Sequence, residues 1–328
     1  GFTVVPTITT VDSLNDVGYG SAIDLDSSGY PHISYGDLSN YTLKYAKWTG
    51  SSWSIEVVDT NLGVVRNTSI ALDSSDYPHI SYYDDINYDL KYAEWTGSSW
   101  LITTVDSTGN VGRYTSIAID NSDYPHISYI DKSNSYLKYA YKDGSGWHIE
   151  TPDPSRYLSE GTSIALDGSG YPHISYSSPN GLRHAYKDES EWHIETVDSV
   201  NTYWSSIALD TDGHQHIAYC VTTNKDLKYA KWTGSSWELD IVDSVGYQPS
   251  IALDSNGYPH ITYDGSNYLK YAGWTGSSWK IEIVDNSGPG VGPLGERHIA
   301  LDSNGYVHIS YYDVSFPKHD LKYARFKP

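Results

Sequence analysis

The sequence of 328 residues predicts an all-β protein built from one repeated unit. A Pro-His-Ile-Ser-Tyr core, exact or slightly varied, occurs seven times, and successive copies are 43 to 48 residues apart. Each copy contains four short segments with strand-like patterns, and four strands in a repeat of about 40–50 residues are typical of a β-propeller blade. We therefore predict one domain, a seven-bladed β-propeller with four antiparallel strands per blade. The core histidines are His32, His79, His126, His173, His216, His260 and His308.

The second copy shows the elements of the unit most clearly. Its second segment alternates apolar and polar residues, as a half-buried strand does. A tight turn precedes that segment, and its last position is Gly or Asp in every copy, residue types that tolerate a positive φ. The four expected strands of this copy are Ser69–Leu72, His79–Tyr83, Leu90–Trp95 and Trp100–Val105.

The two ends of the chain predict how the ring closes. The last copy stops after its third strand, at Phe326, whereas residues 7–12 match residues 54–59, the fourth strand of the first full copy. We expect the N-terminal strand to complete the last blade in a three-plus-one closure, which also removes exposed sheet edges. The expected blades are residues 19–59, 66–106, 113–153, 160–198, 203–243, 247–285 and 296–328, with residues 1–12 closing the seventh.

Three repeated motifs carry a family resemblance. They are Tyr-Pro-His-Ile-Ser-Tyr, Leu-Lys-Tyr-Ala and Trp-Thr-Gly-Ser-Ser-Trp, the last intact in four copies. With these motifs the chain resembles secreted or surface β-propellers of bacteria and archaea, some of them lectins. The resemblance covers the whole chain and implies an extracellular or cell-surface location. It says less about function, because propellers carry many different activities.

Composition limits the classes of partner. The formal net charge is −20, which repels phosphate backbones and makes nucleic acid an unsuitable partner. No apolar run is long enough to cross a membrane, so we expect no membrane insertion. The single cysteine, Cys220, excludes an intrachain disulfide and is interpreted as a packing residue. The sequence predicts neither the oligomeric state nor whether a longer chain exists.

The repeated polar residues have structural interpretations. One histidine per blade spreads around a ring instead of converging on a metal, so we expect each to form a hydrogen bond within its own blade. The lysine of Leu-Lys-Tyr-Ala is expected to form an exposed ion pair with the aspartate of Tyr-x-Asp, worth about 0–1 kcal/mol. The aspartate after each first strand is expected to cap a turn.

A cofactor is not expected. The segment Asp210-Thr211-Asp212-Gly213 resembles the start of a calcium loop, but it lacks the downstream glutamate and the full spacing. Calcium at this turn is the one alternative. The irregular histidines outside the repeat, His298 among them, form no motif for zinc.

Variation between the copies locates a candidate site. The turns between first and second strands, and between third and fourth, scarcely change. The other loops vary in length and content, and we call their end of the ring the loop face. Function is usually carried by variable loops on a rigid scaffold, so we place the site there, at the mouth of the central channel.

The candidate residues lie mainly three positions before the first-strand serine. Around the ring this position predicts a set of bulky polar and aromatic groups, with Trp204 and Arg297 beside it on the same loops. The position reads Tyr19, Arg66, Arg113, Glu160, Tyr203, Tyr247 and Gly295.

Three functions remain open from the sequence. The first is a non-catalytic carbohydrate-binding module, in which aromatic rings stack on sugars and Arg66 and Arg113 pair a uronate or sialate carboxylate. The second is a docking scaffold of a surface layer or adhesin, with a surface protein as partner. The third is an enzyme similar to the propeller polysaccharide lyases, with Arg113 and Tyr114, or Arg66 and a facing tyrosine, as candidate residues. Binding without catalysis is the preferred interpretation.

Overall fold

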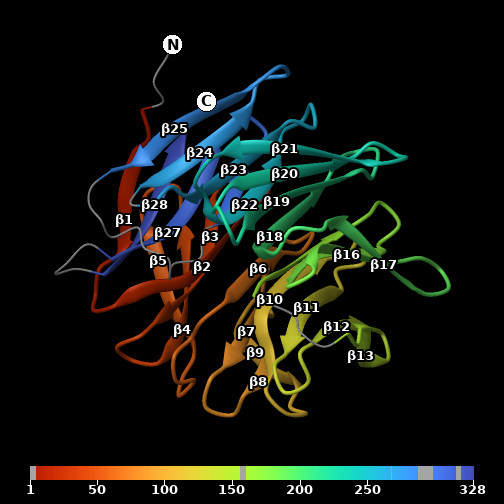
Figure 1. Cartoon of the computed structure of the whole chain (residues 1–328). Helices are drawn as coiled ribbons and strands as arrows, with labels where there is room; N and C mark the ends of the chain where they lie inside the picture. The colour runs from red at the N-terminus through yellow and green to blue at the C-terminus, as the bar shows by residue number, and fades with distance from the viewer. Residues whose placement is uncertain (1–4, 156–159, 267, 287–297, 315–318) are drawn as a thin grey trace.

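The computed structural model describes residues 5–155, 160–266, 268–286, 298–314 and 319–328. Every regular element among them is a β-strand, and none of them belongs to a helix that could cross a membrane. The strands form seven four-stranded antiparallel sheets, so the predicted propeller is confirmed. Figure 1 shows the sheets around a common centre, with the colour running once around the ring from red to blue.

Six blades use four consecutive strands in chain order from the centre outward, and the seventh uses the three C-terminal strands with the N-terminal strand outermost. The innermost strands are β2 (Val17–Leu25), β6 (Thr68–Leu72), β10 (Val111–Ile119), β14 (Thr162–Leu166), β18 (Thr202–Leu209), β22 (Tyr247–Leu253) and β26 (His298–Leu301). The second strands are β3 (Pro31–Asp37), β7 (Pro78–Asp84), β11 (Pro125–Asp131), β15 (Pro172–Ser178), β19 (Gln215–Val221), β23 (Pro259–Asp264) and β27 (Val307–Asp313). The third strands are β4 (Thr42–Trp48), β8 (Asp89–Trp95), β12 (Tyr136–Asp143), β16 (Gly181–Lys187), β20 (Leu227–Trp232), β24 (Leu269–Trp274) and β28 (Asp320–Phe326). The outermost strands are β5 (Trp53–Asp59), β9 (Trp100–Asp106), β13 (Gly146–Asp153), β17 (Trp192–Asp198), β21 (Trp237–Asp243), β25 (Trp279–Asp285) and β1 (Thr7–Asp12).

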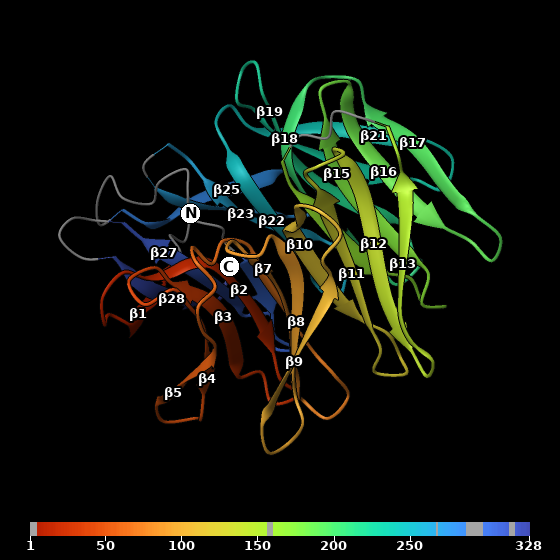
Figure 2. The same cartoon turned by 90° about the horizontal axis from the view of Figure 1, so that it is seen from below.

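The N-terminal strand closes the ring as predicted. Strand β1 pairs antiparallel with β28, with Thr7 opposite Arg325 and Thr10 opposite Lys322, and the sheet order is β1-β28-β27-β26. In Figure 1 the red β1 lies beside the blue β28. Closure therefore joins the two ends of the chain by main-chain hydrogen bonds. It leaves β1 as an outer strand at the rim, where β13 and β17 lie in Figure 2.

The apolar core lies between the blades. One cluster combines Leu43 and Val58 of the first blade with Ile70, Ile80 and Ala93 of the second, all buried. The second strand of each blade is buried along its whole length. Burial of apolar surface at about 25 cal/mol per Å² makes these contacts the main attraction between neighbouring sheets.

The core histidines bond within their own blades, as the sequence predicts. His32 Nδ1 lies 2.6 Å from the hydroxyl of Tyr45, and in the fourth blade His173 Nδ1 lies 3.1 Å from His184 Nε2. The aspartate after the first strand caps its turn, also as predicted, since Asp26 accepts the N–H groups of Ser28 and Tyr30. Each of these pairs is a structural element of the repeat.

The lysine ion pairs differ from the prediction in partner and in exposure. Lys138 Nζ lies 2.5 Å from Asp106, the last residue of the preceding blade's outer strand, and both side chains are largely buried. The aspartate of Tyr-x-Asp instead caps its own loop, as Asp131 does through Asn134. Two lysines also contact that aspartate, Lys44 with Asp37 and Lys322 with Asp313.

The last residue of each outer strand is thus an interblade aspartate. A tyrosine hydroxyl from the second strand of the next blade donates to every one of them, at 2.6–2.8 Å. Burial alone would raise the pKa of Asp106, but the bonds from Lys138 and Tyr129 lower it below its usual value. The seven interblade aspartates are Asp12, Asp59, Asp106, Asp153, Asp198, Asp243 and Asp285.

Removing one partner of this interaction should destabilise the ring. Lys138→Met leaves Asp106 buried beside Tyr129 with no counter-charge, and breaking a buried pair in this way costs about 3–5 kcal/mol. Urea denaturation of the full chain measures the loss. The matched control is Lys132→Met, because Lys132 is exposed in the same blade and its loss should change stability by at most about 0.5 kcal/mol. Equal effects of the two substitutions would show that the interblade pair stabilises nothing.

The core histidines predict a loss of stability in mild acid. Burial lowers the pKa of all seven in the folded chain, to about 4 for His32, His173 and His308. Below the unfolded value of about 6.5 the unfolded chain therefore binds more protons, and each extra proton lowers stability by about 1.4 kcal/mol per pH unit. We expect the urea concentration at the unfolding midpoint to fall as the pH is lowered from 7 to 5. In His126→Gln this midpoint should fall less steeply with pH, because one titrating histidine is removed. A midpoint that stays level or rises over this range would contradict the prediction.

Candidate functional site in the central channel

One position on each inner strand joins it to the next blade. Ser69 on β6 accepts the backbone N–H of Ile117 on β10 at 3.2 Å. We call this the belt position, because the bonds follow one another around the channel and fix the spacing of the inner strands. In the same way, a backbone N–H of the next blade donates to a serine hydroxyl oxygen at 3.2–3.3 Å in four further blades, at Ser116, Ser163, Ser206 and Ser250.

Two blades depart from the belt. The first has Ala22 there, and the N–H of Leu72 bonds instead to Asp24 at 2.9 Å. The seventh has His298, which pairs with Ser310 across its sheet as Ser69 pairs with Ser81. Burial lowers the pKa of His298 to about 4, so the imidazole is neutral at pH 7. A neutral imidazole offers one donor nitrogen and one acceptor nitrogen.

A cavity of about 80 Å³ lies in the channel at this level. Inner strands of five successive blades line it, from β10 to β26. Its larger side chains are Tyr114, Trp204, Gln248 and His298, and belt serines supply hydroxyl groups. Among the described residues, no Asp, Glu, Lys or Arg lines it. The cavity therefore combines aromatic surface with neutral hydrogen-bonding groups.

The residue two positions before the belt has a left-handed backbone in every blade that the structure describes there. In the third, fifth and sixth blades it is Tyr114 (φ 54°), Trp204 (φ 42°) and Gln248 (φ 46°). The left-handed region is strained for such residues, by about 1–3 kcal/mol each, and strain of this kind concentrates at ligand sites. In the other described blades Gly20, Asn67 and Gly161 occupy the position.

The neighbouring blade holds Trp204 in place. The backbone N–H of Trp204 donates to the carbonyl of Glu160 at 3.2 Å. Gly161 lies against the tryptophan, since a Cβ on it would approach Trp204 Cα to 3.0 Å and Cδ1 to 3.3 Å. The glycine thus gives the indole room beside the channel. The ring of Tyr203 lies 5.6 Å away and is partly exposed.

Gln248 contributes a polar group that the protein leaves unsatisfied. Only 9% of its surface is exposed, and among the described residues its Oε1 atom has no hydrogen-bond partner. An unsatisfied buried acceptor costs about 1–3 kcal/mol. Such a group beside a cavity requires an explanation, and a bound molecule that donates a hydrogen bond supplies one.

Most of the residues predicted from the sequence pack between neighbouring blades and not in the channel. Tyr19 lies edge-on against Tyr312 of the seventh blade, with ring centroids 5.6 Å apart. The ring of Tyr247 lies under the ammonium group of Lys225, at 5.5 Å. These side chains connect a blade to its predecessor, and neither lines the channel cavity.

The two described arginines of the predicted site are separately engaged. The Arg113 guanidinium lies 5.1 Å above the ring of Tyr83 and 3.5 Å from the carboxylate of Asp85. Arg66 is exposed and lies over the ring of Tyr19 at 6.0 Å. No described contact joins Arg66 to Arg113. The carboxylate of Asp85 already neutralises Arg113, which leaves it less charge for an acidic sugar.

The cavity therefore shares one residue with the sequence-based site, Trp204. Arg297 lies outside the described residues. Sequence reasoning missed Gln248 as a site residue, named Tyr114 only for a lyase, and treated His298 as irregular. A signal for His298 was present, because it replaces the serine that five other copies have at the belt position.

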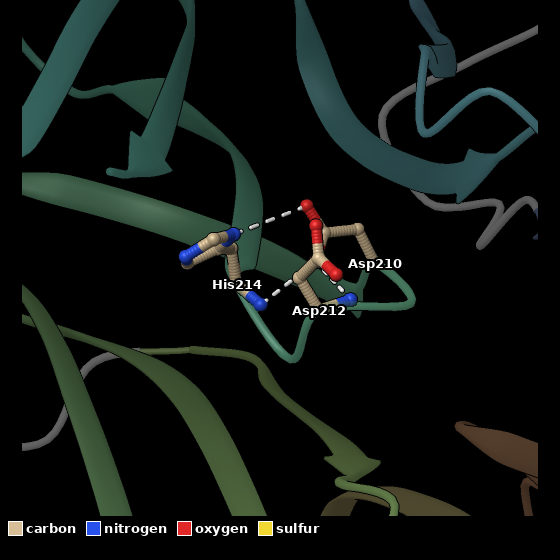
Figure 3. A group of neighbouring side chains, drawn as sticks. All are labelled: Asp210, Asp212 and His214. Carbon is tan, nitrogen blue, oxygen red and sulfur yellow. Dashed lines mark hydrogen bonds and ion pairs between the residues drawn. The ribbon is translucent and has the colours of Figure 1, made fainter. Parts of the chain in front are cut away.

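The turn proposed for calcium brings three ligand types together. Ligand atoms of Asp210, Asp212 and His214 lie within 4.8 Å of one another (Figure 3). The imidazole suits zinc, copper or nickel better than calcium, which prefers oxygen ligands. Asp210 also caps the turn by accepting the N–H groups of Asp212 and His214, as its counterparts do in other blades. The group is thus accounted for as a turn.

A larger cavity, of about 510 Å³, opens between the fifth and sixth blades on the face opposite the loop face. Trp274 and Tyr258 contribute aromatic surface, and Lys231, Glu238 and Asp240 contribute charge. This cavity is the alternative location for ligand binding.

No protein-family model and no curated protein matches the chain. Solved structures do, each over 98% of this chain. A protein of unknown function from Dyadobacter fermentans matches with a TM-score of 0.60 and 9% identity, over 97% of its own length. YCF48 bound to a D1 peptide matches with a TM-score of 0.61 and 14% identity, over 95% of its own length. A catalytically inactive virginiamycin B lyase from Staphylococcus aureus with quinupristin matches with a TM-score of 0.61 and 11% identity, over 99% of its own length. At these identities the likeness shows the propeller fold that the chain shares with them.

Proposed function

We propose that this chain is a non-catalytic carbohydrate-binding module whose site is the channel cavity. The observation that carries the proposal is Trp204, a tryptophan held in a left-handed conformation beside a cavity lined with hydroxyl, amide and imidazole groups. Aromatic faces pack on the apolar faces of sugar rings, and neutral polar groups orient the hydroxyls. Together with the family resemblance, this function favours a location outside the cell or at its surface.

The surroundings of Trp204 support a binding role. Among the described residues, the indole of Trp204 belongs to none of the apolar clusters between blades. The left-handed backbone costs free energy, and the chain provides Gly161 to accommodate it. A feature that is strained and absent from the core is better explained by a ligand than by stability.

Docking of a protein segment is the second candidate. It is favoured by one solved relative in fold, YCF48, whose structure contains a D1 peptide. The exposed rings and guanidinium groups on the loop face, such as Tyr203 and Arg66, suit a peptide better than the small channel cavity does. A polysaccharide lyase has less support, since Asp85 engages Arg113 and no described charged group lines the cavity.

A glycan array separates these functions. We expect wild type to bind a defined subset of glycans, and Trp204→Ala to lose at least about tenfold in affinity because stacking is removed. Trp274→Ala is the matched control, since it removes an equally large aromatic group from the cavity on the opposite face. Thermal unfolding of each variant verifies the fold.

Four results would count against the proposal. Binding to no glycan would favour the docking scaffold, and wild-type affinity in Trp204→Ala would exclude the channel cavity. Loss of binding in Trp274→Ala alone would move the site to the cavity between the fifth and sixth blades. An increase in ultraviolet absorbance on incubation with a uronate polysaccharide would identify a lyase.

A further inference from the structure

The chemistry of the channel cavity also limits which sugars fit. This argument depends on the proposed function, because it names the class of ligand for the same site. Three observations contribute: the charge of the lining, the unsatisfied group of Gln248, and the histidine at the belt position of the seventh blade.

The lining favours a neutral ligand. A carboxylate in this cavity would lose water without meeting a cation among the described residues, and an unpaired buried charge is strongly unfavourable. The formal net charge of −20 adds a repulsive field for any anion that approaches. The pairing of Arg113 with Asp85 removes one cation expected from the sequence. A uronate or sialate is therefore a poor fit.

Gln248 and His298 supply complementary hydrogen-bonding groups. Gln248 lines the cavity, and its amide oxygen is buried without a described protein partner. Once the side chain turns that oxygen toward the cavity, a ligand hydroxyl can donate to it. His298 is neutral at pH 7 and can donate to a second hydroxyl or accept from it. Hydroxyl groups are donors and acceptors at once, so they match both residues without a change of charge.

The size of the cavity restricts how a sugar enters. A cavity of about 150 Å³ holds one benzene molecule, whereas the channel cavity measures about 80 Å³. A sugar ring is bulkier than benzene, so only one edge of it fits inside, and the rest lies against Trp204. An edge with two hydroxyls is available at the end of a glycan chain.

We infer that the channel cavity binds the terminal neutral sugar of a glycan edge-on, with Gln248 and His298 contacting two of its hydroxyls and Trp204 packing against its ring. Uronates are excluded. The inference reverses the ligand class that Arg66 and Arg113 suggest in the sequence.

The first test compares matched neutral and acidic sugars. Full-length protein is applied to an array of oligosaccharides that end in glucose, galactose, mannose, xylose or N-acetylglucosamine, together with glucuronate- and galacturonate-ended partners. We expect at least one neutral-ended probe to bind at least tenfold more tightly than any uronate-ended probe. Equal or tighter binding of a uronate through Trp204 would overturn the inference while preserving carbohydrate binding. Absence of all binding would overturn both.

The second test removes the polar groups of His298 and Gln248 one at a time. His298→Ser restores the residue that five other blades have at the belt position, so the fold should be retained. Gln248→Leu keeps the approximate volume and removes the polar group. We expect each to lower the affinity for the best neutral probe at least tenfold, by calorimetry, with the melting temperature unchanged or raised. Wild-type affinity in both variants, with binding still lost in Trp204→Ala, would show that these two residues do not contact the sugar.

Discussion

The fold depends on a buried carboxylate at the end of each outer strand. This interblade aspartate accepts a tyrosine hydroxyl from the next blade, and in most blades a lysine ammonium as well. Carboxylates at this depth are stable only when they are paired, so each one fixes the position of the following sheet. The apolar clusters supply attraction between blades, but attraction alone does not set the angle between neighbouring sheets. The directional bonds to each interblade aspartate set that angle. Their sevenfold repetition lets the ring close at β1 and β28.

Because the outer parts of the blades determine the ring, the channel is free to vary. The belt serines bond one inner strand to the next, yet the chain tolerates Ala22 and His298 in their place. Two positions earlier, residues range from Gly20 to Trp204 on the same left-handed backbone. A rigid frame with an adjustable lining is a suitable basis for a binding site, since the strain at Trp204 is supported by sheets that do not depend on it.

Comparison of the repeats predicted the fold completely, including the closure, because strand periodicity and matching chain ends are visible in a single sequence. It failed for the lysines, since a motif such as Tyr-x-Asp shows which residues recur and not which blade they face. The site was predicted only in part for a related reason. Alternation along a strand places a side chain correctly only while the backbone stays extended, and the positive φ at Trp204 and Gln248 redirects those side chains. Tyr19 and Tyr247, one residue earlier, pack against the preceding blade instead.

The asymmetry of the channel is the strongest reason to infer a ligand. Seven nearly equal blades would give seven nearly equal channel surfaces if stability alone had shaped them. Instead the first two blades present Gly20 and Asn67, whereas the third, fifth and sixth present Tyr114, Trp204 and Gln248. The larger groups occupy one side of the channel, together with His298 of the seventh blade, and they enclose a cavity. A scaffold that repeats its frame and differentiates its centre supports the proposal of one site for one molecule, and the neutral lining is the reason to propose a neutral ligand.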